Sequence, residues 1–240
     1  MMFSFKKIRS RYFFFAICLL IFFTAVSQRK NDLVEIKFLP VFENETVIPG
    51  KYYPLSQNDS IKIAVLRFYI SSLKLIDQNN HCFFDKPTYH LIDIRDTNSF
   101  FVQTTASFTH NLEKIEFVLG IDSLTNTNGI GTGDLDPAKG MYWTWQSGYI
   151  NMKLEANLKS MAGENSSIVF HLGGFLPPFL ACQKLIFEFE KNTTSKNNVI
   201  VFDIKKYLSA IDLKDQHKVM SPSVKAVDLS KLAAKSFSVK

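Results

Sequence analysis

The sequence predicts an all-β protein: a β-sandwich with a few short helices and one long turn-rich loop. Apolar and β-branched runs of strand length recur along the chain, and several alternate apolar with polar residues, as strands with one buried face do. Clusters of Gly, Pro, Asn, Asp and Ser separate these runs and supply turns. The chain has 240 residues, 46% of them hydrophobic and 23 of them Phe, which is enough apolar material for a full core.

Residues 1–27 are predicted to be a cleavable secretory signal peptide. A basic stretch, residues 1–11, precedes an apolar run over 12–26, and the small residues of Ala25-Val26-Ser27 follow. The apolar run is short for a transmembrane span, which favours cleavage over a retained anchor. We therefore expect a periplasmic or secreted protein with no stable membrane insertion after signal cleavage, and one domain over residues 28–240.

The strands follow in chain order from the apolar runs and the turn signals between them. They are predicted over residues 33–39, 61–76, 88–94, 112–121, 148–158, 167–172, 184–190 and 199–204. The second is long, and its alternation breaks: Ile63 and Val65 share one face, whereas Phe68, Ile70 and Leu73 blur the register. This break predicts a bulge or bend near residues 69–72.

Two short helices are expected late in the chain, over residues 203–208 and 224–235. The second has Leu229, Leu232 and Ala233 at helical spacing, and both are expected to cap the sandwich. The longest turn-rich stretch is residues 123–140, SLTNTNGIGTGDLDPAKG. Long structured loops often carry function.

Oxygen-bearing side chains in and beside this loop raise the possibility of a calcium site: Asp122, Asn126, Asn128, Asp134 and Asp136. Calcium prefers hard oxygen ligands of this kind. However, Asp and Asn beside Gly and Pro also hydrogen-bond the local backbone in ordinary turns. The sequence leaves both interpretations open.

Charge and motif content exclude several function classes. Four of the 28 Lys and Arg residues, and none of the 22 Asp and Glu residues, lie in the first 27 positions, so the remainder is nearly neutral. We therefore expect no binding to nucleic acid, which requires clustered basic residues. The five histidines are scattered, and the sequence has no G-x-S-x-G, P-loop, dinucleotide-binding or H-E-x-x-H motif. It predicts a protein that is not an enzyme.

After signal cleavage two cysteines, Cys82 and Cys182, would remain in an oxidising compartment. They could be thiolate ligands, a structural bridge or two unpaired buried thiols. The absence of a C-x-x-C spacing favours the structural interpretations over a metal site.

The two tryptophans of the chain, Trp143 and Trp145, lie two residues apart behind a glycine turn. If the segment is a strand, both indoles lie side by side on one face, either filling the core or forming the wall of a site. His171, in IVFHLGGF, is either a structural histidine or a ligand. His217 and Met220 add an imidazole and a thioether, a pair that suits Cu(I), although methionine more often fills gaps in a core.

The block GDLDPAKGMYWTWQSGYINMKLE, with LRFYISSLKL, YHLIDI, IEFVLGID and IVFHLGG, resembles the MbnP family of secreted copper-binding proteins. The resemblance spans nearly all of the mature chain. It implies a β-rich, secreted, non-catalytic protein that binds copper, most simply Cu(I). It also implies a site with histidines and a tryptophan oxidised to kynurenine by a partner di-haem enzyme related to cytochrome c peroxidases.

The family pattern maps onto individual residues of this chain. Trp143 and Trp145 match its W-x-W positions, and one of them is the candidate for oxidation. His171 matches the histidine of its F-H-L-G block, and His217 and Met220 match its C-terminal H-x-x-M segment. The alternative is a non-catalytic β-sandwich that serves as an interaction or surface-binding module, with the W-x-W block packed in its core.

Overall fold

Two β-sheets form the part of the protein that the structure, a computed structural model, describes: residues 33–240 without 87, 105, 107–111, 147, 161–164 and 190–197. The predicted signal peptide therefore lies outside the described residues, as does His110. The smaller sheet has the strand order β15-β13-β1-β2, with β7 against β1. Its strands are β1 (Glu35–Phe42), β2 (Glu45–Thr46), β7 (Phe101–Gln103), β13 (Asn198–Asp203) and β15 (Phe237–Val239).

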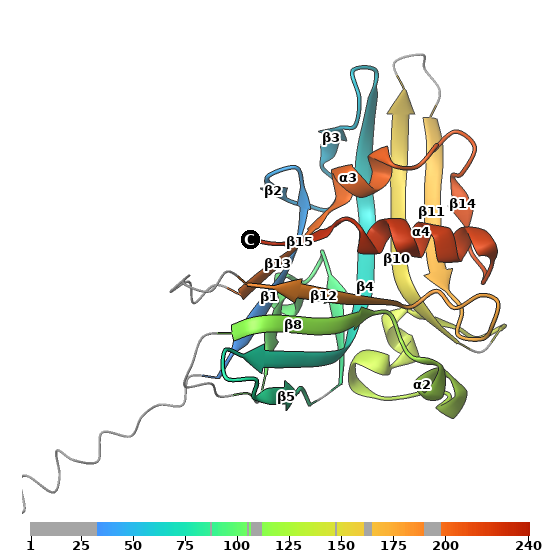
Figure 1. The fold of residues 1–240 in the computed structure, drawn as a ribbon. Helices are drawn as coiled ribbons and strands as arrows, with labels where there is room; N and C mark the ends of the chain where they lie inside the picture. The colour runs from blue at the N-terminus through green and yellow to red at the C-terminus, as the bar shows by residue number, and fades with distance from the viewer. Residues whose placement is uncertain are drawn as a thin grey trace, which may run out of the picture. The chain divides into compact units, whose positions relative to one another are not determined.

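The larger sheet has the order β12-β8-β4-β10-β11-β14, with β3, β5 and β6 against β4 and β9 against β10. Its strands are β3 (Tyr52–Pro54), β4 (Asp59–Asp77), β5 (Cys82–Phe84), β6 (Tyr89–Asp93), β8 (Leu112–Leu119), β9 (Tyr142–Trp143), β10 (Gly148–Ser160), β11 (Asn165–Gly173), β12 (Gln183–Glu188) and β14 (Lys218–Val219). β1 pairs with β13 in parallel, and β11 with β14 in parallel. Figure 1 shows β10 and β11 side by side, with β14 next to β11.

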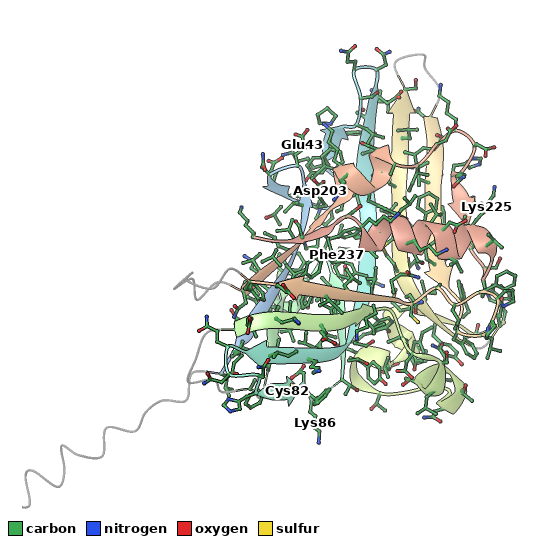
Figure 2. All side chains as sticks on the ribbon, in the orientation of Figure 1. Glu43, Cys82, Lys86, Asp203, Lys225 and Phe237 are labelled. Carbon is green, nitrogen blue, oxygen red and sulfur yellow. The ribbon has the colours of Figure 1, made fainter. Side chains whose placement is uncertain are left out.

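Aromatic side chains join the two sheets across the core. Phe38 of β1 meets Phe117 of β8 edge to face, with ring centroids 5.2 Å apart, and Phe68 of β4 meets Phe202 of β13 at 5.5 Å. Phe237 stacks on Phe202 at 4.5 Å, in the middle of the packed elements (Figure 2). Each such buried ring contributes on the order of 2 kcal/mol of hydrophobic stabilisation. The predicted β-sandwich is confirmed.

The bend predicted in the long strand is also confirmed. Within β4, Ser72 has a positive φ of 51°, and the register with β8 shifts between Ser71 and Lys74. Such a shift bends a strand and increases its twist. The first half of β4 pairs with β10, whereas the second half pairs with β8 and β5.

Both late helices lie where the sequence places them. α3 (Ile204–Ser209) begins after Asp203, whose carboxylate accepts from the N–H of Lys206 at 3.0 Å. α4 (Val224–Ala234) begins after Ser223, which accepts from the N–H of Ala226 at 3.1 Å. These are ordinary N-caps. α4 buries its apolar side against the sandwich and packs on β11 (Figure 1).

The turn-rich stretch contains more helix than the sequence predicts. α2 (Ser123–Asn128) is followed by two short 3-10 helices, η2 (Gly133–Leu135) and η3 (Pro137–Lys139); a further one, η1 (Thr97–Phe100), precedes β7. The Asp122 side chain caps α2 by accepting from the N–H of Thr125 at 2.9 Å. The helix has no apolar periodicity of its own. It therefore depends on this cap and on its tertiary contacts.

The carboxylate of Asp77, at the end of β4, accepts hydrogen bonds from the turn that leads to β5. Burial raises the pKa of Asp77, but hydrogen bonds from the backbone and ring of His81 and from the Asn79 N–H outweigh it and lower the pKa below its ordinary value. The stabilisation is therefore present above the unfolded-state pKa of about 3.9 and is lost as pH falls through the lowered folded-state pKa.

We expect Asp77→Asn to lower the free energy of unfolding by about 1–3 kcal/mol at pH 7, because the backbone N–H groups of Asn79 and His81 lose an ionised, buried acceptor. The difference from wild type should shrink progressively below about pH 4. Urea unfolding at pH 7 and pH 3 measures both values. Asp228→Asn, which changes an exposed aspartate of α4, is the control. An equal loss at both pH values would contradict the account.

Candidate functional site

The outer face of β11 carries His171 and Gly173. Ile168, Phe170 and Leu172 point into the core between the sheets, so the alternate residues lie on the opposite face. There the six-membered ring of Trp143 lies against Gly173: a Cβ added to this glycine would be 2.7 Å from Cζ3 of the indole. Trp143 thus covers Gly173, which lies on the same face of β11 as His171 and two residues after it.

The two indoles are close together, but not for the reason the sequence suggests. β9 ends at Trp143, and Trp145 lies in the turn that follows, so the condition of a continuous strand is not met. The turn nevertheless leaves their ring centroids 6.0 Å apart, with an interplanar angle of 52°. Trp143 is 6% exposed and Trp145 67%, so one belongs to a core and the other to the surface.

Trp143 belongs to a small second core on this outer side of the sheet. It packs there with Tyr69, Met141, Tyr149 and Ile150. The Tyr149 hydroxyl anchors the preceding loop, donating to Leu135 O at 3.0 Å and accepting from the Gly131 N–H at 2.8 Å. The loop and this cluster therefore fix where the buried indole lies.

His171 is held by a carboxylate from the neighbouring strand. Its Nε2 lies 2.9 Å from Oε1 of Glu155, and the same oxygen lies 3.3 Å from Nζ of Lys153. The imidazole is 11% exposed and the Glu155 side chain 36%. Burial lowers the pKa of His171 and outweighs the opposing effect of Glu155, which favours a neutral ring. A neutral imidazole is the form that binds metals.

The chain that contains Met220 runs beside β11. Val169 is paired with Lys218 and Phe170 with Val219, in parallel, so Met220 and His171 each lie one residue beyond the last pair. The two segments stay adjacent: a Cβ added to Gly174 would be 3.2 Å from Cβ of Pro222. Met220 is 40% exposed.

The structure therefore brings Trp143, Trp145 and His171 to one region of the outer face and runs the Met220 segment beside it, whereas His217 lies on the other side of β14 in the chain. The His217 carbonyl accepts from the Val169 N–H at 2.8 Å, but its side chain is exposed at the start of β14. In the parallel register His217 is level with Ile168, further from Gly173 than His171 is.

Four of the five residues considered for calcium, Asp122, Asn126, Asp134 and Asp136, make hydrogen bonds that hold the loop. Asn126 donates to Ile121 O and accepts from the Tyr149 N–H, whereas Asp134 accepts from the Leu91 N–H and from Lys139. Asp136 caps η3. These are turn and cap contacts, so the geometry favours the turn interpretation of these residues.

No group of three or more His, Cys, Asp or Glu among the described residues is arranged to hold a metal ion. Cys82 is an exposed free thiol on β5 (Figure 2), and Cys182 is a free, half-buried thiol whose pKa burial raises. The structure thus has no Cys82–Cys182 bridge, and Cys82 is not buried. Within the described ranges, no helix is long and apolar enough to span a membrane.

Glu155 and Gly173 are the site residues that the sequence did not single out. Glu155 and Lys153 alternate along a strand, which indicates a shared face, but only the pairing of β10 with β11 shows that this face includes His171. Gly173 stands out in the sequence only as the first residue of a strand-ending glycine pair, and nothing in the sequence places an indole over it.

Comparison with known proteins agrees with this architecture. A family model described as MbnP matches residues 31–222. Among solved structures, MbnP from Methylosinus trichosporium is similar, with a TM-score of 0.53 and 16% identity, over 74% of this chain and 77% of that chain. At this level of identity the likeness is one of fold. No curated protein sequence matches the chain.

Proposed function

Because this chain belongs to the MbnP family, we propose that it is a secreted, non-catalytic protein that binds copper as Cu(I) beside Trp143. His171 is the imidazole ligand and Met220 the thioether ligand. The observation that supports the proposal is the parallel pairing of β14 with β11: Met220 follows β14 at the level of His171, and Trp143 lies against Gly173, two residues further along β11.

The donor chemistry fits a soft monovalent ion better than a hard one. Imidazole and thioether together suit Cu(I), whereas calcium and magnesium require several oxygens. Nε2 of His171 is engaged by Glu155, and the described residues provide no hydrogen-bond partner for Nδ1. This nitrogen keeps a lone pair that a metal can use. Lys153 offsets the charge of Glu155, which leaves little net charge to attract a divalent ion.

The proposal includes oxidation of one tryptophan by a di-haem enzyme related to cytochrome c peroxidases. Kynurenine has a ketone and an aryl amine where the indole has neither, so oxidation would add polar donors beside His171. With 67% of its surface exposed, Trp145 is the indole that a large oxidant can reach directly, and Trp143 lies 6.0 Å from it between ring centroids.

Anaerobic titration of the purified chain with Cu(I), against a competing chelator, tests the proposal. We expect about one equivalent to bind and to quench tryptophan fluorescence, and Met220→Leu to weaken binding by about tenfold or more. His217→Ala, which changes an exposed histidine outside the cluster, should bind as wild type does. Lack of competitive Cu(I) binding by wild type would reject the copper function.

Exposed apolar side chains favour a second candidate function, an interaction module. Trp145, Leu176 and Leu180 are 67%, 59% and 41% exposed. Phe175 lies against Gly148, the residue paired with Trp143, so the segment that contains Leu176 and Leu180 begins near the end of β10 at which Trp145 lies. Exposed apolar residues grouped in this way typically mark binding surfaces. A chain that binds no copper in the titration would retain this function.

A further inference from the structure

We propose that Glu155 is a positioning residue for the copper site: its carboxylate accepts from Nε2 of His171, which selects the tautomer and orientation of the ring and leaves Nδ1 free for the metal. This inference rests on the proposed function, and it goes beyond it by assigning a role to a residue that binds no metal itself.

The strand pairing accounts for the contact. β10 and β11 are antiparallel, with Lys153 opposite His171 and Glu155 opposite Val169. All four lie on the outer face, so Glu155 is a diagonal neighbour of His171, a separation that long side chains span. Its Oε1 reaches Nε2 of His171 at 2.9 Å.

The chemistry of imidazole sets the consequence. In the neutral ring one nitrogen donates and the other accepts. Glu155 is a carboxylate and can only accept, so the proton of His171 lies on Nε2 and the lone pair on Nδ1. Histidines that bind metals commonly donate their second nitrogen to a carboxylate in this way, which fixes the ring and makes the ligand nitrogen more basic.

Lys153 holds the carboxylate in place. Its Nζ lies 3.3 Å from the same Oε1 that His171 contacts, and its side chain is 19% exposed. This one carboxylate oxygen therefore contacts two donors, Lys153 from its own strand β10 and His171 from the neighbouring strand β11. Lys153 steadies Glu155 but does not contribute the contact that selects the tautomer.

Nitrogen-15 NMR of the histidine rings in the copper-free protein tests the inference without metal. Wild type should show His171 protonated at Nε2 and unprotonated at Nδ1. Glu155→Leu should lose this preference, whereas Glu155→Gln should retain it because the amide oxygen still accepts. His90, whose Nε2 lies 2.5 Å from Asp85, is an internal reference that should not change in either variant.

Cu(I) affinity is the second readout. Glu155→Leu should bind about 10- to 100-fold more weakly than wild type, as is typical for loss of a carboxylate behind a ligand, and Glu155→Gln should recover most of this loss. Glu116→Leu is the matched control, because it removes a strand glutamate of β8 that is paired with Lys184 and does not contact His171.

The outcomes separate the two proposals. If wild type binds Cu(I) and Glu155→Leu binds equally well, the positioning role is wrong and the copper function stands. If wild type binds no Cu(I), the copper function fails. The tautomer measurement still decides whether Glu155 orients the ring, and an unchanged His171 tautomer in Glu155→Leu overturns the inference.

Discussion

His171→Ala is expected to weaken Cu(I) binding by at least about 100-fold, more than the loss typical of a residue behind a ligand. The imidazole is the nitrogen donor that the described residues place beside both Trp143 and the Met220 segment. Competition titration against a Cu(I) chelator measures the change.

The fold should survive this substitution. Among the described residues, Glu155 is the hydrogen-bond partner of the His171 ring. Glu155 keeps its contact with Lys153 when the imidazole is removed. We expect urea unfolding to show a loss of about 1–2 kcal/mol in the free energy of unfolding. A variant that is strongly destabilised yet binds Cu(I) as wild type does would make His171 a structural histidine instead.

Gly173→Ala should be the most damaging small substitution on this face. A Cβ there would lie 2.6 Å from the carbonyl oxygen of Tyr149 and 2.7 Å from Cζ3 of Trp143, and the first of these is backbone that cannot turn aside. Overpacking of this kind typically costs about 1–3 kcal/mol. The indole would also move relative to His171, so Cu(I) affinity should fall with stability.

Thermal unfolding, near-ultraviolet circular dichroism and the Cu(I) titration together test this prediction. Val169→Ala is the matched control, because it changes the same face of β11 two residues before His171 and introduces no clash. Unchanged tryptophan dichroism in Gly173→Ala would show that the ring does not depend on the space above this glycine.

The longer strands of this protein could be predicted because each is encoded locally, whereas strands of two or three residues such as β9 and β14 were missed. Alternation of apolar and polar residues places β4, and the break in that alternation places its bend at Ser72. The predicted helix over 224–235 is equally local, with apolar spacing and a serine cap. By contrast, α2 depends on a cap and on tertiary contacts, which is why the sequence suggested only a loop.

The candidate site could be predicted only in part, because it is assembled by pairing between distant segments. The sequence singled out Trp143, His171 and Met220 by residue type and by resemblance. That Met220 lies beside His171 follows from the parallel β14, a two-residue strand with no signal of its own. The contact of Glu155 with His171 likewise depends on the register between β10 and β11.

Measurement of intact mass and bound copper on the same sample of protein, isolated after export, tests the central claim most directly. We expect about one copper ion per chain, and a mass shift equal to the conversion of one tryptophan to kynurenine. Copper with an unmodified mass would retain the His171 and Met220 site without the oxidation. A chain with neither copper nor modification, and which takes up no Cu(I) on reconstitution, would contradict the account.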